Sequence, residues 1–290
     1  MLMSRLLGKQ LVISVLTTLL ALITLAGIFA PFLAPHDPNL VDLSHKLNSP
    51  SLEFPLGTDQ LGRCVLSRLL YGTRVTLSLT LLIVASCVAI ALIIGSIAGY
   101  VGGLIDNILM RVCDTILSFP SFILAICLIS IWGVGWQQMV FVLITIQSVY
   151  YTRFIRGLVT NLRQQNYILA AKVCGSSPFL IMIRHIIPNL LSPLVIVVTL
   201  EIGWVIMDIS ALSFIGLGVQ SPTPEWGAMI NEGKSFLLSH PRLLLAPGIM
   251  IFCVVALFNL LGETLGGKKG TTKSIRKSKK EPVEGLGGTQ

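Results

Sequence analysis

Six long apolar stretches are the feature that most constrains what this chain can fold into. They cover residues 11–33, 76–99, 116–134, 136–152, 190–217 and 243–262. A helix that crosses a bilayer needs about 20 consecutive apolar residues. Only 12% of the 290 residues are charged, against roughly 25% in a soluble domain, which excludes a disordered chain, a coiled coil and an ordinary soluble enzyme. The sequence therefore predicts an all-α membrane protein with six transmembrane helices.

The distribution of basic residues predicts the orientation of these helices. With the N-terminus in the cytoplasm, 15 of the 21 lysines and arginines fall in cytoplasmic segments and six in external ones, as the positive-inside rule requires. Omitting the weakest stretch, 136–152, would place the basic loop 153–189 outside. We therefore expect a cytoplasmic segment 1–10, a membrane domain 11–262 and a basic, disordered cytoplasmic tail 263–290.

The sequence contains no residue pattern typical of a disulfide framework, a metal site or a nucleotide-binding loop. The six cysteines form no C-x-x-C pair and the four histidines no H-x-x-x-H spacing, so we expect neither a disulfide framework nor a metal site in this chain. The run Gly262–Lys269 nearly reads G-x-x-x-x-G-K-[ST], but lysine replaces the hydroxyl residue and an apolar span precedes it. The net charge of +8 is explained by orientation signals, and no nucleic-acid partner is expected.

The loop 153–189 contains a predicted short helix with a compact face. Asn161 and Gln164 have the spacing of a capping box at its start, and Gly175 suits the left-handed position that ends a helix. Pro178 then breaks the chain, and Pro188 opens the next span. Compact side chains at i, i+3, i+4 and i+7 share one face, namely Tyr167, Ala170, Ala171 and Cys174. From these residues alone, docking on a soluble partner and lying on lipid headgroups both stay open.

The same loop resembles the EAA loop of the permeases of ATP-binding-cassette (ABC) importers. The match consists of Leu169-Ala170-Ala171, Gly175 and Ile187-Pro188, with Leu169 in place of the family's glutamate and His185 in place of an isoleucine. Other segments are similar to the dipeptide, oligopeptide and nickel permeases of the smaller subunit type, over about residues 10–262. These segments are Leu56–Arg63 with Ser67–Leu69, Asp106, Met110–Arg111, Asp114, Phe119–Pro120, Leu212–Gly218 and Pro222–Met229. Cys64 stands where that family usually has aspartate.

This resemblance implies a type I importer permease in the inner membrane of a bacterium, with both termini in the cytoplasm. Such a chain works with a homologous second permease, two cytoplasmic ATPases and an extracytoplasmic solute-binding protein. The ATPases would bind ATP and magnesium, so this chain is expected to have no catalytic residue and no cofactor. The short helix would be the coupling helix that docks on an ATPase, through Tyr167, Leu169, Ala170, Ala171, Cys174, Gly175 and Pro188.

Two acidic residues lie within the fifth apolar stretch. Glu201 and Asp208 are seven residues apart, on one helix face, and each costs about 2.5–3.5 kcal/mol at the bilayer centre on insertion scales. We therefore expect both to face the permease–permease interface or a wet translocation path, with Trp204 between them. Contact with a cationic or metal-bearing solute and simple packing between the two permeases both stay open.

The external segments give two further expectations. The alternation of apolar and basic residues over Leu61–Leu70 predicts an interfacial amphipathic helix. Candidates for contact with the solute-binding protein are Glu225, Trp226, Glu232 and Lys234. A solvated loop is the equal alternative for these four residues.

Three classes of function are compatible with such a chain to different degrees. For an importer permease, the Thr199–Gly203 run resembles nickel-type permeases, which favours nickel, cobalt or a metal-chelate complex over dipeptides and oligopeptides. A stand-alone secondary carrier would move protons on Glu201 and Asp208, but it needs neither a docking helix nor a binding-protein surface. A membrane enzyme would need a nucleophile–base pair or a metal constellation, and the sequence offers neither.

Overall fold

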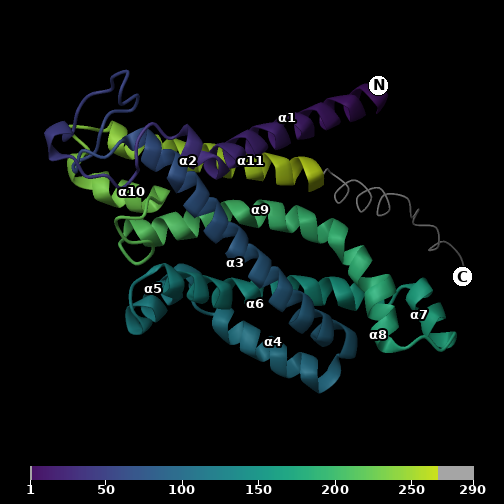
Figure 1. The fold of residues 1–290 in the computed structure, drawn as a ribbon. Coiled ribbons are helices and arrows are strands. Elements are labelled where there is room, and N and C mark those ends of the chain that lie inside the picture. The colour runs from purple at the N-terminus through teal and green to yellow at the C-terminus, as the bar shows by residue number, and fades with distance from the viewer. Residues whose placement is uncertain (1, 267–290) are drawn as a thin grey trace, which may run out of the picture.

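The computed structural model describes residues 2–266, and within them the fold is helical, with one isolated β-bridge between Thr58 and Cys64. Figure 1 shows the long helices as a bundle whose two ends carry the short elements. The larger elements are α1 (Leu2–Ile28), α3 (Val65–Val101), α4 (Gly103–Leu117), α5 (Ser121–Trp132), α6 (Trp136–Arg163), α9 (Ile187–Phe214) and α11 (Arg242–Gly266). The short ones are α2 (Ala30–Leu33), α7 (Asn166–Val173), α8 (Pro178–Ile181), α10 (Trp226–Gly233), the 3-10 turns Leu43–His45 and Lys234–Phe236, and the π-helical turn Met182–Ile186.

Helix length and apolarity are compatible with six spans. Within the described residues, four helices are long and apolar enough to cross a membrane, at Gly8–Ile28, Val65–Val101, Pro178–Phe214 and Arg242–Gly266. The pair α4 and α5 adds a fifth candidate if it counts as one span. The weakest predicted stretch, 136–152, lies in α6, whose 28 residues extend about 42 Å at 1.5 Å per residue. Of the predicted tail 263–290, only residues 263–266 fall in the described part, as the end of α11.

The predicted third span, 116–134, is divided in the structure. α4 ends at Leu117 and α5 begins at Ser121, and the two helices meet at 86°. Pro120 explains the break, because proline lacks a backbone N–H and disfavours helical geometry in the residue before it. The 12 residues of α5 extend about 18 Å, which is short of a hydrocarbon core of about 30 Å.

The fifth predicted span begins earlier than expected, because Pro178 starts a helix that continues to Phe214. Ser177 caps this helix by accepting a hydrogen bond from Leu180 N at 3.3 Å. Pro188 lies in the first turn of α9, as the sequence predicts, but the helical turns that begin at Pro178 precede it. The preceding turn is π-helical, with Ile187 N donating to the Met182 carbonyl five residues back. A wider turn relieves the clash that a proline ring makes with the carbonyl four residues earlier.

The tightest helix pair is α3 with α6. A Cβ atom added to Gly95 would lie 2.7 Å from the Thr152 carbonyl oxygen, and one added to Gly99 would lie 2.8 Å from both the Arg156 oxygen and Val159 Cβ. Two glycines four residues apart let two membrane helices approach backbone to backbone. The pair forms the centre of the bundle, with α9 packed on α3 and α11 packed on α9.

The segments predicted to share one side of the membrane also share one end of the bundle. α7, α8, the start of α1 and the end of α11 lie at the right-hand end in Figure 1, and both views place α10, α2 and the loops before α3 at the opposite end. This arrangement agrees with the predicted topology. Which end faces the cytoplasm stays a prediction from the positive-inside rule.

Candidate functional site

The short helix predicted in the loop 153–189 is present as α7, but it starts later than expected. α6 continues to Arg163 and includes Asn161, so the capping box predicted for Asn161 and Gln164 is wrong. Apolar side chains keep this part helical: Val159 is fully buried where α6 meets Gly99. α7 then begins at Asn166, after Gln165, whose side chain makes no capping hydrogen bond.

Gly175 ends α7 in the way that the sequence predicts. Its φ of +80° lies in the left-handed region that favours glycine. Gly175 N donates to the Lys172 carbonyl at 3.0 Å, and Ser176 N donates to the Ala171 carbonyl at 3.1 Å. This pair of hydrogen bonds is the Schellman motif. It turns the chain sharply before α8 and leaves α7 as a separate short element.

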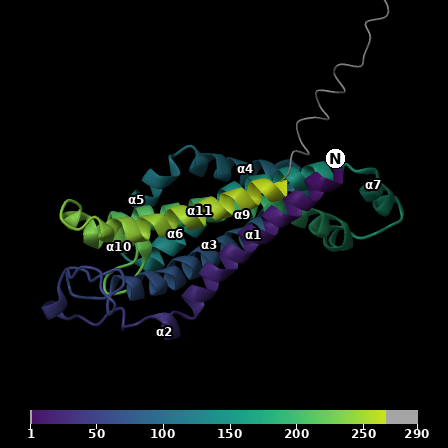
Figure 2. The same ribbon diagram turned by 90° about the horizontal axis from the view of Figure 1, so that it is seen from above.

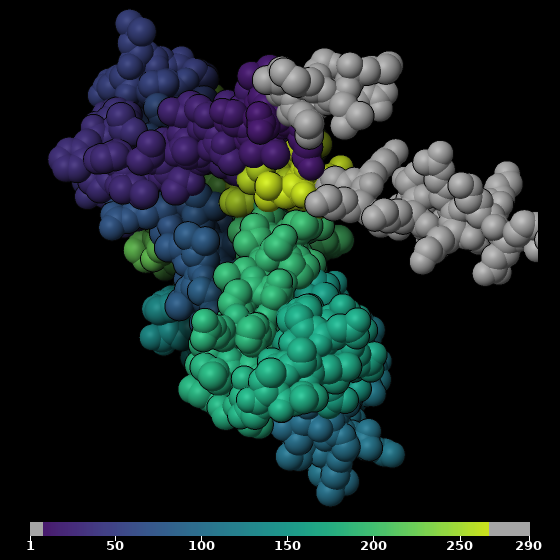
Figure 3. Space-filling model, turned by 90° about the vertical axis from the view of Figure 1, so that its right-hand side faces the viewer, coloured from purple at the N-terminus to yellow at the C-terminus, as the bar shows by residue number. Residues whose placement is uncertain are grey.

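Most of α7 faces away from the rest of the described chain. Ile168 is fully buried and anchors the helix, whereas Tyr167, Leu169, Ala170 and Cys174 are exposed and Ala171 is half-buried. Figure 2 shows α7 projecting beyond the bundle, and in Figure 3 the teal and green residues of this region fill the lower part of that end. Pro188 is exposed but belongs to α9, beyond the π-helical turn.

Three side-chain contacts that the sequence did not indicate hold α7 and the end of α6 in place. The Lys172 ammonium nitrogen lies 5.3 Å from the centre of the Tyr100 ring at the end of α3, a cation–π distance. Arg163 donates to the Tyr100 carbonyl at 2.7 Å. The rings of Tyr167 and His185 lie 6.4 Å apart, which links α7 to the π-helical turn. α7 therefore contacts both the α3–α4 turn and the helix that continues into α9.

The two membrane acids and the tryptophan between them line one cavity. Glu201, Trp204 and Asp208 share a face of α9 and border a cavity of about 630 Å³ between α5, α6 and α9. Gln147 Nε2 donates to Asp208 Oδ2 at 2.8 Å. The remaining lining residues are Leu117, Ser121, Phe122, Ala125, Leu143, Ile146, Tyr150, Met207 and Ala211. The sequence did not predict Gln147 and Tyr150 as lining residues, because no local pattern places α6 beside α9.

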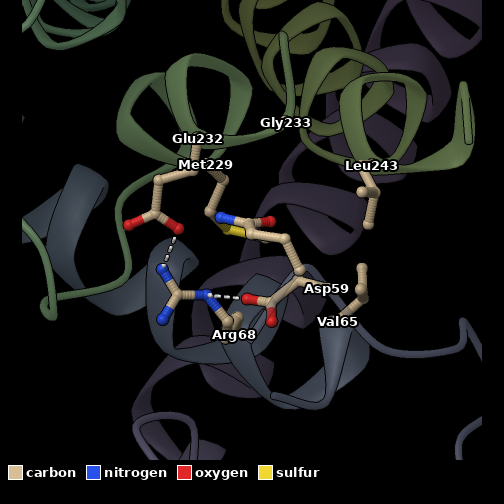
Figure 4. A pocket seen from close by; sticks show the side chains of 8 residues that line it. Asp59, Val65, Arg68, Met229, Glu232, Gly233 and Leu243 are labelled. Atoms are coloured by element: carbon tan, nitrogen blue, oxygen red, sulfur yellow. Dashed lines mark hydrogen bonds and ion pairs between the residues drawn. The ribbon is translucent and has the colours of Figure 1, made fainter. Parts of the chain in front are cut away.

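A buried cluster of four charged residues closes the opposite end of the bundle. Arg63 and Arg68 are each only 1% exposed. Glu232 Oε2 accepts from Arg63 at 2.6 Å and from Arg68 at 3.0 Å, while Asp59 Oδ2 accepts from Arg63 Nε at 2.6 Å. Figure 4 shows Arg68 between Asp59 and Glu232. The two positive guanidinium groups and the two negative carboxylates sum to zero net charge. Such pairing offsets the desolvation penalty of burying charged groups.

This cluster corrects the amphipathic-helix prediction for Leu61–Leu70. α3 begins only at Val65, and residues before it form a turn in which Asp59 Oδ1 accepts from Leu61 N and Arg63 N. The basic side chains point into the protein because acidic partners lie there. One of those partners, Glu232, is more than 160 residues away in sequence.

The predicted solute-binding-protein contacts of Glu225 and Trp226 are also corrected, because both side chains are fully buried. Glu225 caps α10 by accepting from Gly227 N at 3.0 Å and Ala228 N at 2.9 Å, and burial raises the pKa of this carboxyl group. Trp226 Nε1 donates to the Leu69 carbonyl at 3.3 Å. Glu232 is mostly committed to the buried cluster. Of the four external candidates only Lys234 is exposed.

Within residues 2–266, no group of three or more histidine, cysteine, aspartate or glutamate side chains is placed to hold a metal ion. The cavity acids are therefore a pair without the further ligands that a tight metal site needs.

Comparison with known proteins identifies related chains. A family described as binding-protein-dependent transport system inner membrane component matches residues 91–267. The nickel transport system permease protein NikC of Escherichia coli K12 is 33% identical over 247 residues, which cover 85% of this chain and 89% of that protein. The glutathione transport system permease protein GsiD of Escherichia coli O157:H7 is 37% identical over 245 residues, covering 84% and 81%.

A solved structure shares the fold. A chain of the MetNI methionine ABC transporter superposes with a TM-score of 0.53 at 21% sequence identity, covering 68% of this chain and 94% of that one. The low identity limits this likeness to the fold, which is the helical permease fold of an ABC importer.

Proposed function

This chain belongs to the family of binding-protein-dependent inner-membrane permeases of peptide and nickel ABC importers, and on that premise we propose that it forms, with a homologous second permease, the path by which nickel, cobalt or a metal-chelate complex enters the cell. Two cytoplasmic ATPases bind ATP and magnesium and drive the cycle, and the chain itself hydrolyses nothing. A solute-binding protein delivers the solute at the α10 end, and both termini lie in the cytoplasm.

The observation that carries this proposal is the connection between α7 and the cavity. α7 is exposed on its Tyr167, Ala170 and Cys174 face, so an ATPase cleft can receive it. The helical segment that follows, Pro178–Phe214, continues through the π-helical turn Met182–Ile186 into α9, which carries the cavity acids. A displacement of α7 is therefore transmitted along this helical segment to the cavity. Alternating access requires such a link between the ATPase-docking helix and the solute path.

The cavity supports a positively charged solute over a neutral or anionic one. Among the described residues, the only formally charged ones that line it are Glu201 and Asp208, and acids at membrane depth mark ion or substrate paths. The nickel permease relative favours a metal-bearing solute, and the glutathione permease relative favours a peptide. Import of a dipeptide or oligopeptide by the same architecture is the second candidate.

Co-purification and uptake test this function together. The chain, tagged in its native host, should bring down ATPase subunits, and liposomes holding the complete complex should take up labelled solute only with ATP and the binding protein. Uptake in a deletion strain should then be compared for nickel salts, nickel chelates and dipeptides. Uptake of dipeptides alone would reject the metal proposal, and transport by the purified chain on an ion gradient would reject the importer proposal.

A further inference from the structure

We propose, resting on the function above, that the α5–α6–α9 cavity recognises a cation enclosed in an organic shell, such as a chelated metal or an organic ammonium, and does not bind a bare hydrated metal ion. The proposal names the solute class of the same path. It stands on the charge, the spacing and the aromatic lining of the cavity, each of which is independent of what binds α7.

The charge of the cavity is uncompensated within the described chain. No lysine, arginine or histidine lines it. Gln147 satisfies one oxygen of Asp208 through a neutral amide, and Glu201 makes no hydrogen bond or ion pair with another residue between 2 and 266. A carboxylate at membrane depth needs a counter-charge, and a cationic solute supplies one.

The spacing of the two acids argues against a bare metal ion. Seven residues along a helix correspond to about 10 Å of rise, whereas metal ligands lie within about 2.0–2.6 Å of the ion. This spacing disfavours ligation of one ion by Glu201 and Asp208 together. The cavity volume of about 630 Å³ falls in the range of roughly 300–1,000 Å³ that holds organic ligands. An ion with six waters fills only about 180 Å³ at roughly 30 Å³ per water.

Aromatic side chains provide the surface that an organic cation uses. Trp204 lies between the two acids on the same face of α9 and is 60% exposed, and Tyr150 of α6 and Phe122 of α5 also line the cavity. Aromatic faces attract cations whose own hydration is weak, as in ammonium-binding cages. A strongly hydrated aqua ion gains little from such a face, so the combination of acids and aromatic rings selects for an organic shell.

Substitution-inert cobalt complexes give a direct test, because they keep their charge and shell during the measurement. The complete transporter in lipid nanodiscs should be equilibrated by dialysis with tris(ethylenediamine)cobalt(III), with the anionic cobalt(III)–EDTA complex, with aqueous nickel(II), and with tetraethylammonium as a metal-free cation. We expect the two organic cations to bind at least tenfold more tightly than aqueous nickel, and the anionic complex not to bind.

Variants assign the binding to the cavity. Asp208→Asn and Glu201→Gln should each weaken binding of the organic cations by about tenfold, and Trp204→Leu should weaken tetraethylammonium binding at least as much. Glu263→Gln, an exposed acid at the end of α11, is the matched carboxylate-to-amide control and should bind normally. Gel filtration and ATPase co-purification verify that each variant assembles. Asp208→Glu keeps the negative charge and should bind the organic cations, which separates the effect of charge from the effect of substitution at this position.

The outcomes separate this inference from the function beneath it. Equal or tighter binding of aqueous nickel, binding of the anionic complex, absence of binding by both organic cations, or normal binding by all three cavity variants would overturn the inference while ATPase co-purification still supports an importer. Loss of ATPase co-purification by the wild-type chain would instead reject the proposed function.

Discussion

Glu232→Gln should open the segment 59–64, the turn that precedes the N-terminal end of α3. In the native chain, one Glu232 oxygen accepts from both buried arginines, Arg63 and Arg68. Glutamine keeps the size of the side chain but removes its charge. Among the described residues, Asp59 then remains as the only acid paired with the two guanidinium groups, which are each 1% exposed.

The magnitude follows from the burial of the cluster. Removing one partner of a buried ion pair costs about 3–5 kcal/mol, because the remaining charge is left uncompensated. The Glu232 side chain is itself 17% exposed, so some water reaches it and we take the lower value, about 3 kcal/mol. At about 1.4 kcal/mol per tenfold change, the open state of the segment should become roughly 100-fold more populated.

Cys64 reports this opening without any engineered label. It follows Arg63 directly and is 2% exposed, so its thiol reacts with a maleimide only when the segment opens. Labelling followed by peptide mass spectrometry should show a roughly 100-fold faster reaction of Cys64 in Glu232→Gln. The reaction of Cys174, exposed at the opposite end on the turn after α7, should not change and serves as the internal reference.

An exposed ion pair provides the matched control. Arg153 and Asp114 lie 2.7 Å apart with side chains 50% and 58% exposed, so Asp114→Asn should cost less than about 1 kcal/mol and leave Cys64 labelling nearly unchanged. If Glu232→Gln labelled Cys64 at the wild-type rate, the buried charges would not be what closes this end, and the argument from burial would be wrong.

Three further substitutions test the coupling helix and the bundle centre. Gly175→Val forces a β-branched residue to φ +80° with open space around it, which costs about 1–3 kcal/mol of backbone strain. In the reconstituted complex, ATP hydrolysis should continue while solute uptake falls. Normal uptake would refute the docking role. Lys172→Ala should raise the ratio of ATP hydrolysed to solute imported, whereas Lys172→Arg, which keeps a cation over Tyr100, should restore it. Gly99→Val should lower thermal stability by about 2 kcal/mol or more through overpacking against α6, measured against Gly157→Ala, where no atom lies within 4 Å.

The membrane spans could be predicted from the sequence because apolarity over about 20 residues is a local property. The end of α7 could also be predicted, since the left-handed conformation at Gly175 depends only on neighbouring residues. The break at Pro120 was local as well, but its signal was hidden inside an apolar stretch that reads as one helix.

What could not be predicted depends on partners distant in the chain. Whether Arg63 is exposed or buried is decided by Glu232, 169 residues later, and no local pattern distinguishes the two cases. Glu225 and Trp226 lie at the start of α10 in a segment whose sequence is typical of a solvated loop, yet Glu225 accepts from Thr76 of α3 and Trp226 donates to the Leu69 carbonyl of α3. The face shared by Glu201, Trp204 and Asp208 followed from helical periodicity, whereas Gln147 became part of the cavity only once α6 was placed beside α9.

The glycine contact between α3 and α6 determines which parts of this molecule are able to move. With Gly95 and Gly99 against the α6 backbone, sliding or tilting one of these helices past the other would collide main chain with main chain, so the two act as a fixed frame. We expect bending of the backbone at three less constrained positions: the Schellman turn at Gly175, the π-helical turn before Pro188 and the kink at Pro120. We therefore expect the proposed transport cycle to pivot α9 about the stationary pair α3 and α6, and we expect mutations or drugs that stiffen those three turns to stop the cycle without contacting the solute.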